Sequence, residues 1–523
     1  MNESHRTRRE FLKMLGLGAT SLAVCSVPVR ASKETPHGVT TNRPNIILIM
    51  ADDLGYSDIG CYGGEIKTPN LDALAAGGLR FRQFYNCAKC NPTRASLLTG
   101  QYDQAVGVKD MEYGATFGEV LRAAGYRTII SGKWHQQPLP TTRGFDRYYG
   151  LADGCCNYWN PGTKARPGEG TPGQKTPAPR RWVIEDKVIM GYTPQDKNFY
   201  TTDAFANYAI ERLEEYKNES KPFLLYLPQT APHYPLHAWP DDIAKYRGKY
   251  KIGWDELRKQ RYKRQIEMGL IDRKYELSPR DEAVPSWESL SDSQKDQADL
   301  TMAVYAAMVD RMDQAIGRVL DKVKQIGKWQ NTLVLFLADN GGCAETPDTT
   351  PDIPPGPVEG YRAVGPRWAN ASNTPYRKYK ATDYHGGNCT PFFAYWPGVI
   401  QPGAFTDQVG HIIDILPTFM DITGAAYPDQ INGRKIKPLA GKSLLPIFRG
   451  EQRQPHDALY WQYGKAKAVR VGDWKLVQYG KADWELYDLK EDRTELHNLA
   501  AQHREKVTQM AAMWETWWQN CRS

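Results

Sequence analysis

An uninterrupted apolar run most constrains the fold of this chain. Residues 45–53 read Asn-Ile-Ile-Leu-Ile-Met-Ala-Asp-Asp, and no polar residue lies between Asn45 and Asp52. A strand with one solvated face alternates apolar and polar residues, whereas a run without alternation is typical of a strand buried on both faces of a parallel sheet. Similar runs follow at 128–132, 223–227 and 332–338. We therefore expect a mostly parallel sheet with both faces covered.

Helical patterns occupy the segments between these runs, at 69–77, 92–98, 117–124, 202–216 and 300–326. Strand–helix alternation predicts an α/β domain, here residues 42–450, in which helices sandwich a large mixed, mostly parallel sheet. Over 451–523 the pattern changes to four short, partly alternating strands followed by a helix at about 502–518. This change predicts a small C-terminal α+β domain, an antiparallel sheet plus one helix.

Two long stretches, 151–198 and 238–298, interrupt the alternation. The first is rich in Gly, Pro and Lys, and the second is strongly charged and begins with helical patterns. Such segments are either solvated additions to the scaffold or walls of a substrate cleft. Tyr158, Trp159 and Trp239 are candidates for lining such a cleft, against a sugar or an aromatic ring.

The first 31 residues have the pattern of an export signal. Adjacent arginines at 8–9 precede a mildly apolar stretch over 14–29 that is rich in small residues. This predicts a twin-arginine signal peptide over 1–31, a twin-arginine translocase as a partner, and a periplasmic or secreted location in a bacterium. A retained membrane anchor and a lipoprotein signal at Cys25 are the alternatives.

Charge and cysteine content argue against a nucleic-acid-binding protein and against a disulfide-rich framework. The net charge is +7, of which residues 1–31 contribute +3, five basic side chains less two acidic ones, so that about +4 remains for the rest. This balance is too mild to indicate binding of nucleic acid. Of the nine cysteines, seven remain when Cys25 and Cys90 are set aside, and an odd number is a poor disulfide framework that leaves room for one or two bridges, whose pairing the sequence does not give.

Two polar pairs close apolar runs: Asp52-Asp53 and Asp339-Asn340. In open α/β sheets, ligands gather beyond the carboxyl ends of the strands. Three carboxylates and one amide oxygen form an all-oxygen set, which suits Ca²⁺ or Mg²⁺ better than zinc. Each pair alone is also typical of a helix cap or a turn.

Residues 90–100 read Cys-Asn-Pro-Thr-Arg-Ala-Ser-Leu-Leu-Thr-Gly. Pro92 favours a helix start, which places Cys90 at a helix N-terminus, where free N–H groups and the helix dipole favour an anion. Arg94 lies four residues on and can face back toward position 90. Cys87 and Cys90 also form a Cys-x-x-Cys pair, typical of redox proteins. The redox interpretation explains neither the rest of the run nor the acidic pairs.

The pattern Cys-x-Pro-x-Arg, followed five residues later by Thr-Gly, resembles the signature of the sulfatases, whose cysteine is oxidised to formylglycine (3-oxoalanine). The chain departs from it at Thr93, where serine is commoner, and His385 stands where the family has Glu before Gly-Gly. Within the family, arylsulfatase-like bacterial members are the most similar. The resemblance extends over nearly the whole mature chain, through 45–55, Gly-Lys-Trp-His at 132–135, 231–233, 338–341, 375–398, 485–489 and 498–499.

This resemblance implies an alkaline-phosphatase-like fold and hydrolysis of sulfate monoesters of an aryl alcohol or a carbohydrate. It also implies a formylglycine-generating maturation enzyme that modifies Cys90. The implied metal is Ca²⁺, with Mg²⁺ as the alternative, and its ligands are residue 90 together with Asp52, Asp53, Asp339 and Asn340.

The resemblance also assigns catalytic roles. Arg94 and Lys133 steady the hydrated aldehyde, and His135 is the base that collapses the sulfated intermediate. His233 protonates the leaving oxygen, and Lys380 holds a sulfate oxygen. At two positions a neighbour competes: His237 with His233, and Arg377 or Lys378 with Lys380.

Two other functions agree with the same residues. One is a phosphonate or phosphate ester hydrolase that uses the same modified residue. The other is an inactive relative that binds sulfated glycans and keeps an unmodified thiol. In each of these functions the partner is an anionic small molecule or glycan, and a sulfated one is the leading expectation.

Overall fold

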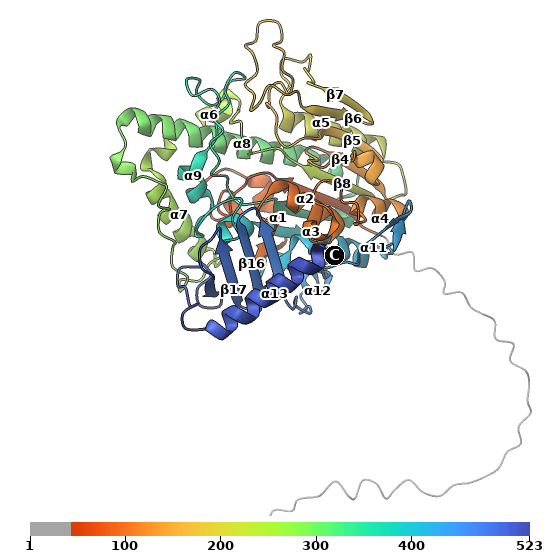
Figure 1. Ribbon diagram of the computed structural model, residues 1–523. Helices are drawn as coiled ribbons and strands as arrows, with labels where there is room; N and C mark the ends of the chain where they lie inside the picture. The colour runs from red at the N-terminus through yellow and green to blue at the C-terminus, as the bar shows by residue number, and fades with distance from the viewer. Residues whose placement is uncertain (1–42, 523) are drawn as a thin grey trace, which may run out of the picture. The chain divides into compact units, whose positions relative to one another are not determined.

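The computed structural model describes residues 43–522, which are built around a ten-stranded mixed sheet (Figure 1). At its centre β1 (Asn45–Ala51) lies between β9 (Thr332–Ala338) and β8 (Phe223–Pro228) and is parallel to both. Next to β8 follow β4 (Arg127–Ser131) and β5 (Arg147–Leu151), again parallel. Every residue of β1, β8 and β9 is buried, as their unbroken apolar runs predict.

Shorter strands, most of them antiparallel to their neighbours, complete the sheet at both ends. On one side β10 (Phe392–Tyr395) pairs with β9, followed by β2 (Leu79–Phe81) and β11 (Ala404–Thr406). On the other side the hairpin of β6 (Arg181–Ile184) and β7 (Lys187–Met190) extends from β5. The stretch 151–198 therefore adds two strands to the sheet.

Helices cover both faces of the sheet. The Tyr226 ring of β8 packs edge-on against Phe117 of α4 (Phe117–Ala123), with 5.5 Å between ring centroids. The Ser131 hydroxyl of β4 donates a hydrogen bond to the Phe205 carbonyl of α5 (Thr201–Glu215) at 2.8 Å. Ile130 is the register partner of Tyr226, so the next residue, Ser131, points to the opposite face. The predicted α/β sandwich is confirmed.

Helix α8 (Asp292–Gln325) packs beside α5 and begins eight residues before the predicted start at 300. Ser291 and Gln294 form a capping box, in which each side chain bonds the backbone N–H of the other residue. This satisfies N–H groups that the first turn would otherwise leave unpaired. The charged residues 292–299 therefore belong to this helix and not to the loop before it.

The stretch 238–298 is tied to the core by buried charges. It holds α6 (Pro240–Ala244) and α7 (Trp254–Glu267). Arg261 of α7 is fully buried and pairs with Asp58 and Glu65, each at 2.8 Å. Paired charges of this kind lock a helix in place, so this stretch is not a solvated addition.

The C-terminal part forms the predicted antiparallel sheet and helix. Strands β15 (Leu459–Tyr463), β16 (Ala466–Val471), β17 (Trp474–Tyr479) and β18 (Glu485–Asp488) pair in chain order, and α13 (Arg504–Arg522) lies across them (Figure 1). The Trp461 indole donates a hydrogen bond to the Asn86 carbonyl at 2.7 Å, and Arg470 donates one to the Tyr85 hydroxyl at 2.7 Å. This sheet therefore supports the segment that leads into Cys90.

The other elements are short. They are α1 (Pro69–Ala76), β3 (Phe84–Tyr85), α2 (Cys90–Thr99), α3 (Asp103–Val106), α9 (Gly365–Ser372), α10 (His385–Asn388), β12 (Gly410–His411), α11 (Ile415–Thr423), β13 (Gln430–Ile431), β14 (Arg434–Lys435) and α12 (Leu445–Phe448). Within 43–522, no helix combines the length and the apolar character needed to cross a bilayer. The predicted signal peptide and its alternatives lie outside the described residues.

Candidate active site

Two neighbouring strands bring the polar pairs together. Ala51, the last residue of β1, is the register partner of Ala338, the last residue of β9. The strands are parallel, so Asp52 and Asp339 leave the sheet side by side at its carboxyl edge. Both side chains are fully buried. The structure thus assembles the two pairs that the sequence places 286 residues apart.

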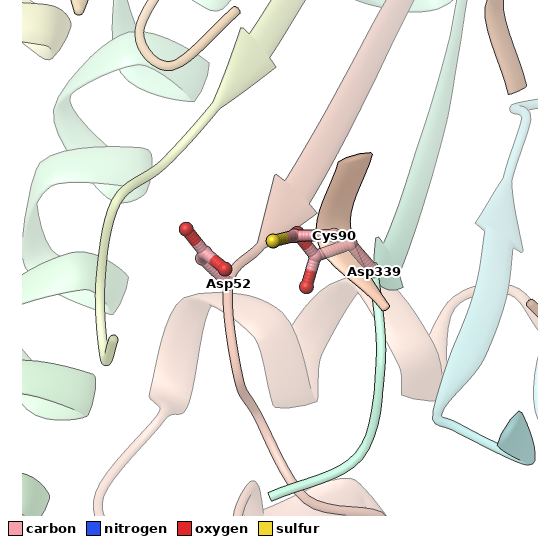
Figure 2. A group of neighbouring side chains, drawn as sticks. All are labelled: Asp52, Cys90 and Asp339. Carbon is pink, nitrogen blue, oxygen red and sulfur yellow. The ribbon is translucent and has the colours of Figure 1, made fainter. Parts of the chain in front are cut away.

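Cys90 is the first residue of α2, and its side chain points toward Asp52 and Asp339 at the carboxyl edge of the sheet. Its sulfur and carboxylate oxygens of Asp52 and Asp339 all lie within 4.8 Å of one another. Figure 2 shows the three side chains gathered at the carboxyl end of β1. Burial raises the pKa of the Cys90 thiol, and the charges of Lys133 and Lys380 only partly offset this effect. An unmodified Cys90 is therefore a protonated thiol and a poor nucleophile.

Each carboxylate of the site is paired with a cation, and Asp52 lies 3.8 Å from a second one, Arg94. Asp339 accepts two hydrogen bonds from the Arg94 guanidinium, at 2.9 and 3.2 Å, and Asp53 accepts one from Lys380 at 2.6 Å. All of these groups are buried, and three negative charges face three positive ones. The pairs are Lys133 with Asp52, Lys380 with Asp53 and Arg94 with Asp339.

These pairs shift the acidity of the carboxyl groups in opposite directions. Burial raises the pKa of Asp53, but Lys380 and His233 outweigh it, so the pKa lies well below its usual range. For Asp339, burial and the nearby Asp52 raise the pKa to about 6 in spite of Arg94. One carboxylate of the site is thus firmly ionised, while another needs further positive charge to stay ionised.

Three buried oxygens of the site have no hydrogen-bond partner within residues 43–522. They are Oδ1 of Asp52, Oδ2 of Asp53 and Oδ1 of Asn340. An unpaired buried carboxylate or amide oxygen is costly, and coordination to a cation satisfies it. The unpartnered oxygens therefore belong to the very residues that the sequence assigns to a metal, and the donor set fits Ca²⁺ or Mg²⁺.

Of the two competing histidines, His233 belongs to the site. Its Nε2 lies 3.6 Å from Asp53 Oδ2, and its Nδ1 lies 2.6 Å from the Tyr234 carbonyl. That carbonyl can only accept, so Nδ1 carries the proton and Nε2 faces the site with its lone pair. Burial lowers the pKa of His233 to about 3. By contrast, His237 is fully buried and bonds the Gly360 carbonyl at 2.7 Å, a structural role.

His135 lies on the other side of the nucleophile, in a loop joined to the start of α2. Its carbonyl accepts a hydrogen bond from the Asn91 side chain at 2.6 Å, and its own Nδ1 has no partner within 43–522. The backbone of His135 is left-handed, with φ of 62°. Such strain in a non-glycine residue is typical of functional sites, and Asp53, with φ of 64°, shares it.

The motifs do not predict three further contacts at the site. The Tyr158 hydroxyl lies within hydrogen-bond distance of the Thr230 carbonyl (2.5 Å) and the His233 carbonyl (2.8 Å), so it holds the loop of that histidine. The buried Thr93 hydroxyl accepts the Cys87 N–H at 3.0 Å. At the site's edge, Lys89 pairs with Glu345. No local pattern marks Tyr158 or Glu345, because their partners are distant in sequence.

One of the expectations needs correction. Tyr158 and Trp159 do not line a cleft: their side chains are buried, and Trp159 packs edge-on against Trp239 at 4.5 Å. The apolar rings prefer this cluster to water, which accounts for the difference. The rival redox interpretation gains no support: all cysteines of residues 43–522 are free, and the Cys87 thiol donates to Ser96 at 3.3 Å.

His385, at the position where the family has Glu, lies outside the catalytic cluster. Its Nε2 bonds the Tyr85 hydroxyl at 2.9 Å, and its Nδ1 bonds the Arg493 carbonyl at 2.7 Å. A carboxylate is still supplied nearby, because Glu495 accepts the His385 backbone N–H at 2.8 Å. Arg377 and Lys378, the rivals of Lys380, bond Tyr487 and Asp281 instead of the site.

Comparison with known proteins agrees with this geometry. The sulfatase family model matches residues 44–425, and the model of the C-terminal part of N-sulphoglucosamine sulphohydrolase matches residues 380–520. An uncharacterised sulfatase of Schizosaccharomyces pombe is 33% identical, over 91% of this chain and 93% of its own length. An arylsulfatase of Klebsiella aerogenes is 32% identical, over 80% of this chain and 94% of its own length.

Solved structures show the same fold. The crystal structure of Ps i-CgsB superposes with a TM-score of 0.67 at 26% identity, covering 91% of this chain and 93% of that one. The PsFucS1 sulfatase from Pseudoalteromonas sp. and the phosphonate monoester hydrolase of Agrobacterium radiobacter, each 20% identical, share this alkaline-phosphatase-like fold with TM-scores of 0.62 and 0.57. The family model covers well over half of the chain, and the relatives match it nearly end to end. The chain belongs to the sulfatase family and is a hydrolase of sulfate esters.

Proposed function

We propose that this sulfatase acts on a sulfated saccharide through a formylglycine made from Cys90, with Ca²⁺ as its metal, after export by the twin-arginine route. One observation carries the catalytic part: the Cys90 sulfur and carboxylate oxygens of Asp52 and Asp339 lie within 4.8 Å of one another at a helix start. An oxygen nucleophile at position 90 thus lies directly beside the donors for a cation.

The state of the thiol argues for its modification. Burial keeps an unmodified Cys90 protonated, so it would not attack sulfur. Hydrated formylglycine supplies two hydroxyl groups on one carbon: one attacks sulfur and displaces the alcohol, and the other then loses its proton, which expels sulfate and restores the aldehyde. The step from thiol to aldehyde requires the maturation enzyme.

Charge balance argues for a bound cation. The three carboxylates and three cations of the site cancel, which leaves no net attraction for an anionic ester. Asp52, Asp53 and Asn340 would hold the ion through their unpartnered oxygens, with Asp339 and residue 90. A bound divalent ion would polarise the sulfate and favour ionisation of the nucleophile. Hard oxygen ligands in this number favour Ca²⁺.

The remaining side chains are placed for proton transfer and charge stabilisation. Lys133 and Lys380 are buried beside the nucleophile and would hold the sulfate oxygens as charge develops. His135, neutral because burial and nearby cations depress its pKa, would take the proton that releases sulfate. His233 would protonate the leaving oxygen; an anionic ester bound beside it raises its low pKa toward the range of a proton donor.

Relatives support a saccharide as the alcohol part. A structure of Ps i-CgsB, 25% identical to this chain with a TM-score of 0.66, is described as a complex with k-i-k-neocarrahexaose. In this chain the rim of the site is polar: the Tyr234 hydroxyl donates to Glu345 at 2.7 Å, and Lys175 donates to that hydroxyl at 3.0 Å. Such groups suit sugar hydroxyls better than an aryl ring.

The test uses protein co-expressed with a formylglycine-generating enzyme. We expect the peptide 81–102 to be lighter by about 18 daltons, the covalent change from thiol to aldehyde. We expect that protein to release sulfate from sulfated saccharides and aryl sulfates. Protein made without the maturation enzyme and the Cys90→Ala variant are the controls. An unmodified thiol with full activity, or a clear preference for an aryl phosphonate over the matching aryl sulfate, would overturn the proposal.

Export is tested separately. Residues 1–31 are fused to a reporter that folds in the cytoplasm, and the reporter is assayed in the periplasm. We expect it to appear there with the native sequence and to stay behind when Arg8 and Arg9 are both replaced by Lys, because the translocase reads the paired arginines. Equal export of both fusions contradicts the twin-arginine route.

A further inference from the structure

A basic pocket adjoins the nucleophile on the His135 side. Its volume is about 290 Å³, at the lower end of the range for small-ligand sites. Asn91 directly follows Cys90, so the pocket begins next to the reacting group. Around it lie Asn91 and His135 together with the charged side chains of Lys109, Asp153, Arg180 and Arg181.

Two of its cations are uncompensated. Arg181 is neutralised by Asp153, which accepts its backbone N–H at 2.6 Å and its Nε–H at 2.9 Å. The Arg180 guanidinium, in contrast, forms no hydrogen bond or ion pair within residues 43–522, although its Nε is buried. Lys109 is exposed at the same pocket and has no ion pair in this part of the chain. A buried donor without a partner is costly unless a ligand supplies one.

The pocket is held by rigid parts of the fold. The Arg180 carbonyl accepts the Gly191 N–H at 2.8 Å, which closes the β6–β7 hairpin at the edge of the main sheet. On the opposite wall the Asn91 and Gln136 side chains each donate to the other residue, at 3.2 and 3.0 Å. Sites built on fixed elements hold their ligands in a defined geometry.

We propose that this pocket binds a second anionic group of the substrate and that Arg180 determines this specificity. The substrate is then a sulfated saccharide with a carboxylate or a second sulfate close to the sulfate that is cleaved. A guanidinium pairs with either anion through two parallel N–H groups, and the Lys109 ammonium adds attraction. A neutral alcohol would leave the buried Arg180 donor unpaired. The inference rests on the proposed sulfatase activity at Cys90.

The test compares three disaccharides that share the sulfate to be cleaved. The first has no other charge, the second also contains a uronate, and the third contains a second sulfate. For wild-type enzyme we expect a higher kcat/KM for a doubly charged substrate than for the neutral one. The charge ratio is kcat/KM for the doubly charged substrate divided by kcat/KM for the otherwise neutral one. Arg180→Gln should lower this ratio roughly ten- to hundredfold, mainly through KM, because a charged hydrogen-bond pair is lost. Arg180→Lys should lower it less. Whichever substrate gives the larger ratio, the one with the uronate or the one with the second sulfate, identifies the anion that the pocket prefers.

The matched control is Lys164→Gln, an exposed lysine of the same stretch 151–198 that does not line the pocket. We expect it to keep both the activity and the ratio. Thermal unfolding of each variant verifies that it is folded. A wild-type ratio near one for both doubly charged substrates, or a ratio that Arg180→Gln leaves unchanged, overturns the proposal.

A binding measurement separates this inference from the proposed activity. Calorimetry with Cys90→Ala, which cannot turn over, should show tighter binding of a doubly charged disaccharide than of the neutral one. The difference should disappear in Cys90→Ala/Arg180→Gln. If the wild type hydrolyses no sulfate ester, the proposed function fails, and the binding comparison still decides whether Arg180 recognises the second anion.

Discussion

The Tyr158 hydroxyl lies 2.8 Å from the carbonyl oxygen of His233 and fixes the backbone that carries this histidine. Tyr158→Phe removes the contact and the parallel one to Thr230. We expect kcat with an aryl sulfate to fall about tenfold while KM changes little, because the proton donor is displaced and the sulfate contacts remain. The unfolding free energy should fall by about 1–2 kcal/mol.

Tyr200→Phe is the matched control. The buried Tyr200 hydroxyl donates to the carbonyl of His237, the structural histidine, at the same 2.8 Å. We expect a similar loss of stability, read from denaturant unfolding, and no loss of kcat. Equal effects of the two variants on kcat would mean that Tyr158 acts on stability alone.

A metal ion should stabilise the folded protein through the three unpartnered oxygens. After treatment with a chelator, adding Ca²⁺ to a hundredfold excess over its Kd should raise the unfolding free energy by about 2.7 kcal/mol. The shift should be smaller with Mg²⁺ and should shrink strongly in Asp53→Asn. Asp203→Asn, which changes an ion pair on α5 outside the site, should leave it intact. Thermal scans at several ion concentrations measure this, and a wild type that responds to neither ion contradicts the site.

Asp383 predicts a pH dependence of stability. Its carboxylate is fully buried, and neither oxygen has a hydrogen-bond partner within 43–522. Burial raises its pKa to about 7, although Lys475 opposes the shift and Asp103 and Glu495 add to it. Between about pH 4 and 7 the folded state thus binds a proton that the unfolded state releases, so this contribution to stability falls as the pH rises. Asp383→Asn should raise the unfolding free energy at pH 8 by on the order of 2–4 kcal/mol and change it little at pH 4.

Asp414→Asn should change the unfolding free energy in the opposite direction, as a loss of stability. Burial raises the pKa of Asp414, but Arg453 at 2.9 Å and His456 at 2.7 Å outweigh it and hold the pKa well below its usual range. The stabilisation by this group is present above the unfolded pKa and is lost as the pH falls. Denaturant unfolding should therefore show a similar loss of stability in this variant at pH 8 and pH 4, and the loss should shrink only as the pH falls below about 4, the pKa of an unfolded Asp. Curves for the two variants that shift in the same direction would refute the assignment.

His385→Glu should destabilise the protein in spite of restoring the family residue. The new carboxylate would be buried beside Glu495, which already pairs with Lys475 at 2.7 Å. We expect a loss of about 3–5 kcal/mol, the usual cost of an uncompensated buried charge. His385→Glu/Glu495→Gln should lose less than the sum of the two single variants, because Lys475 then pairs with the new carboxylate. Additive losses in this double-mutant cycle would show that the two positions do not interact.

Much of the fold and the site follows from local sequence. The apolar runs predict β1, β4, β8 and β9, because strands buried on both faces must be apolar throughout. The two polar pairs are expected together, since parallel strands end at one edge of the sheet. The start of α8 could also have been found, because Ser291-x-x-Gln294 is a capping-box pattern.

Other features depend on contacts between distant segments. Strands β2 and β10 are only three and four residues long, and their pairing joins residues more than 300 positions apart. Nothing near Tyr158 indicates that it bonds the His233 carbonyl, 75 residues away. Arg181 pairs with Asp153, whereas Arg180 has no ion-pair partner within residues 43–522. This difference likewise depends on how the β6–β7 hairpin places the two side chains. Side-chain roles of this kind need the three-dimensional arrangement.

The sheet that supports the segment before Cys90 is synthesised long after that segment. Trp461 and Arg470 reach Asn86 and Tyr85, so the support of the nucleophile waits for roughly 370 further residues after Cys90. At ribosomal rates this takes on the order of twenty to seventy seconds. In the finished fold Cys90 is 5% exposed and closed to another enzyme. Under the proposed modification, synthesis itself sets a time limit: Cys90 must be oxidised before the C-terminal sheet folds against the segment that precedes it, because the finished fold shields the side chain from the maturation enzyme.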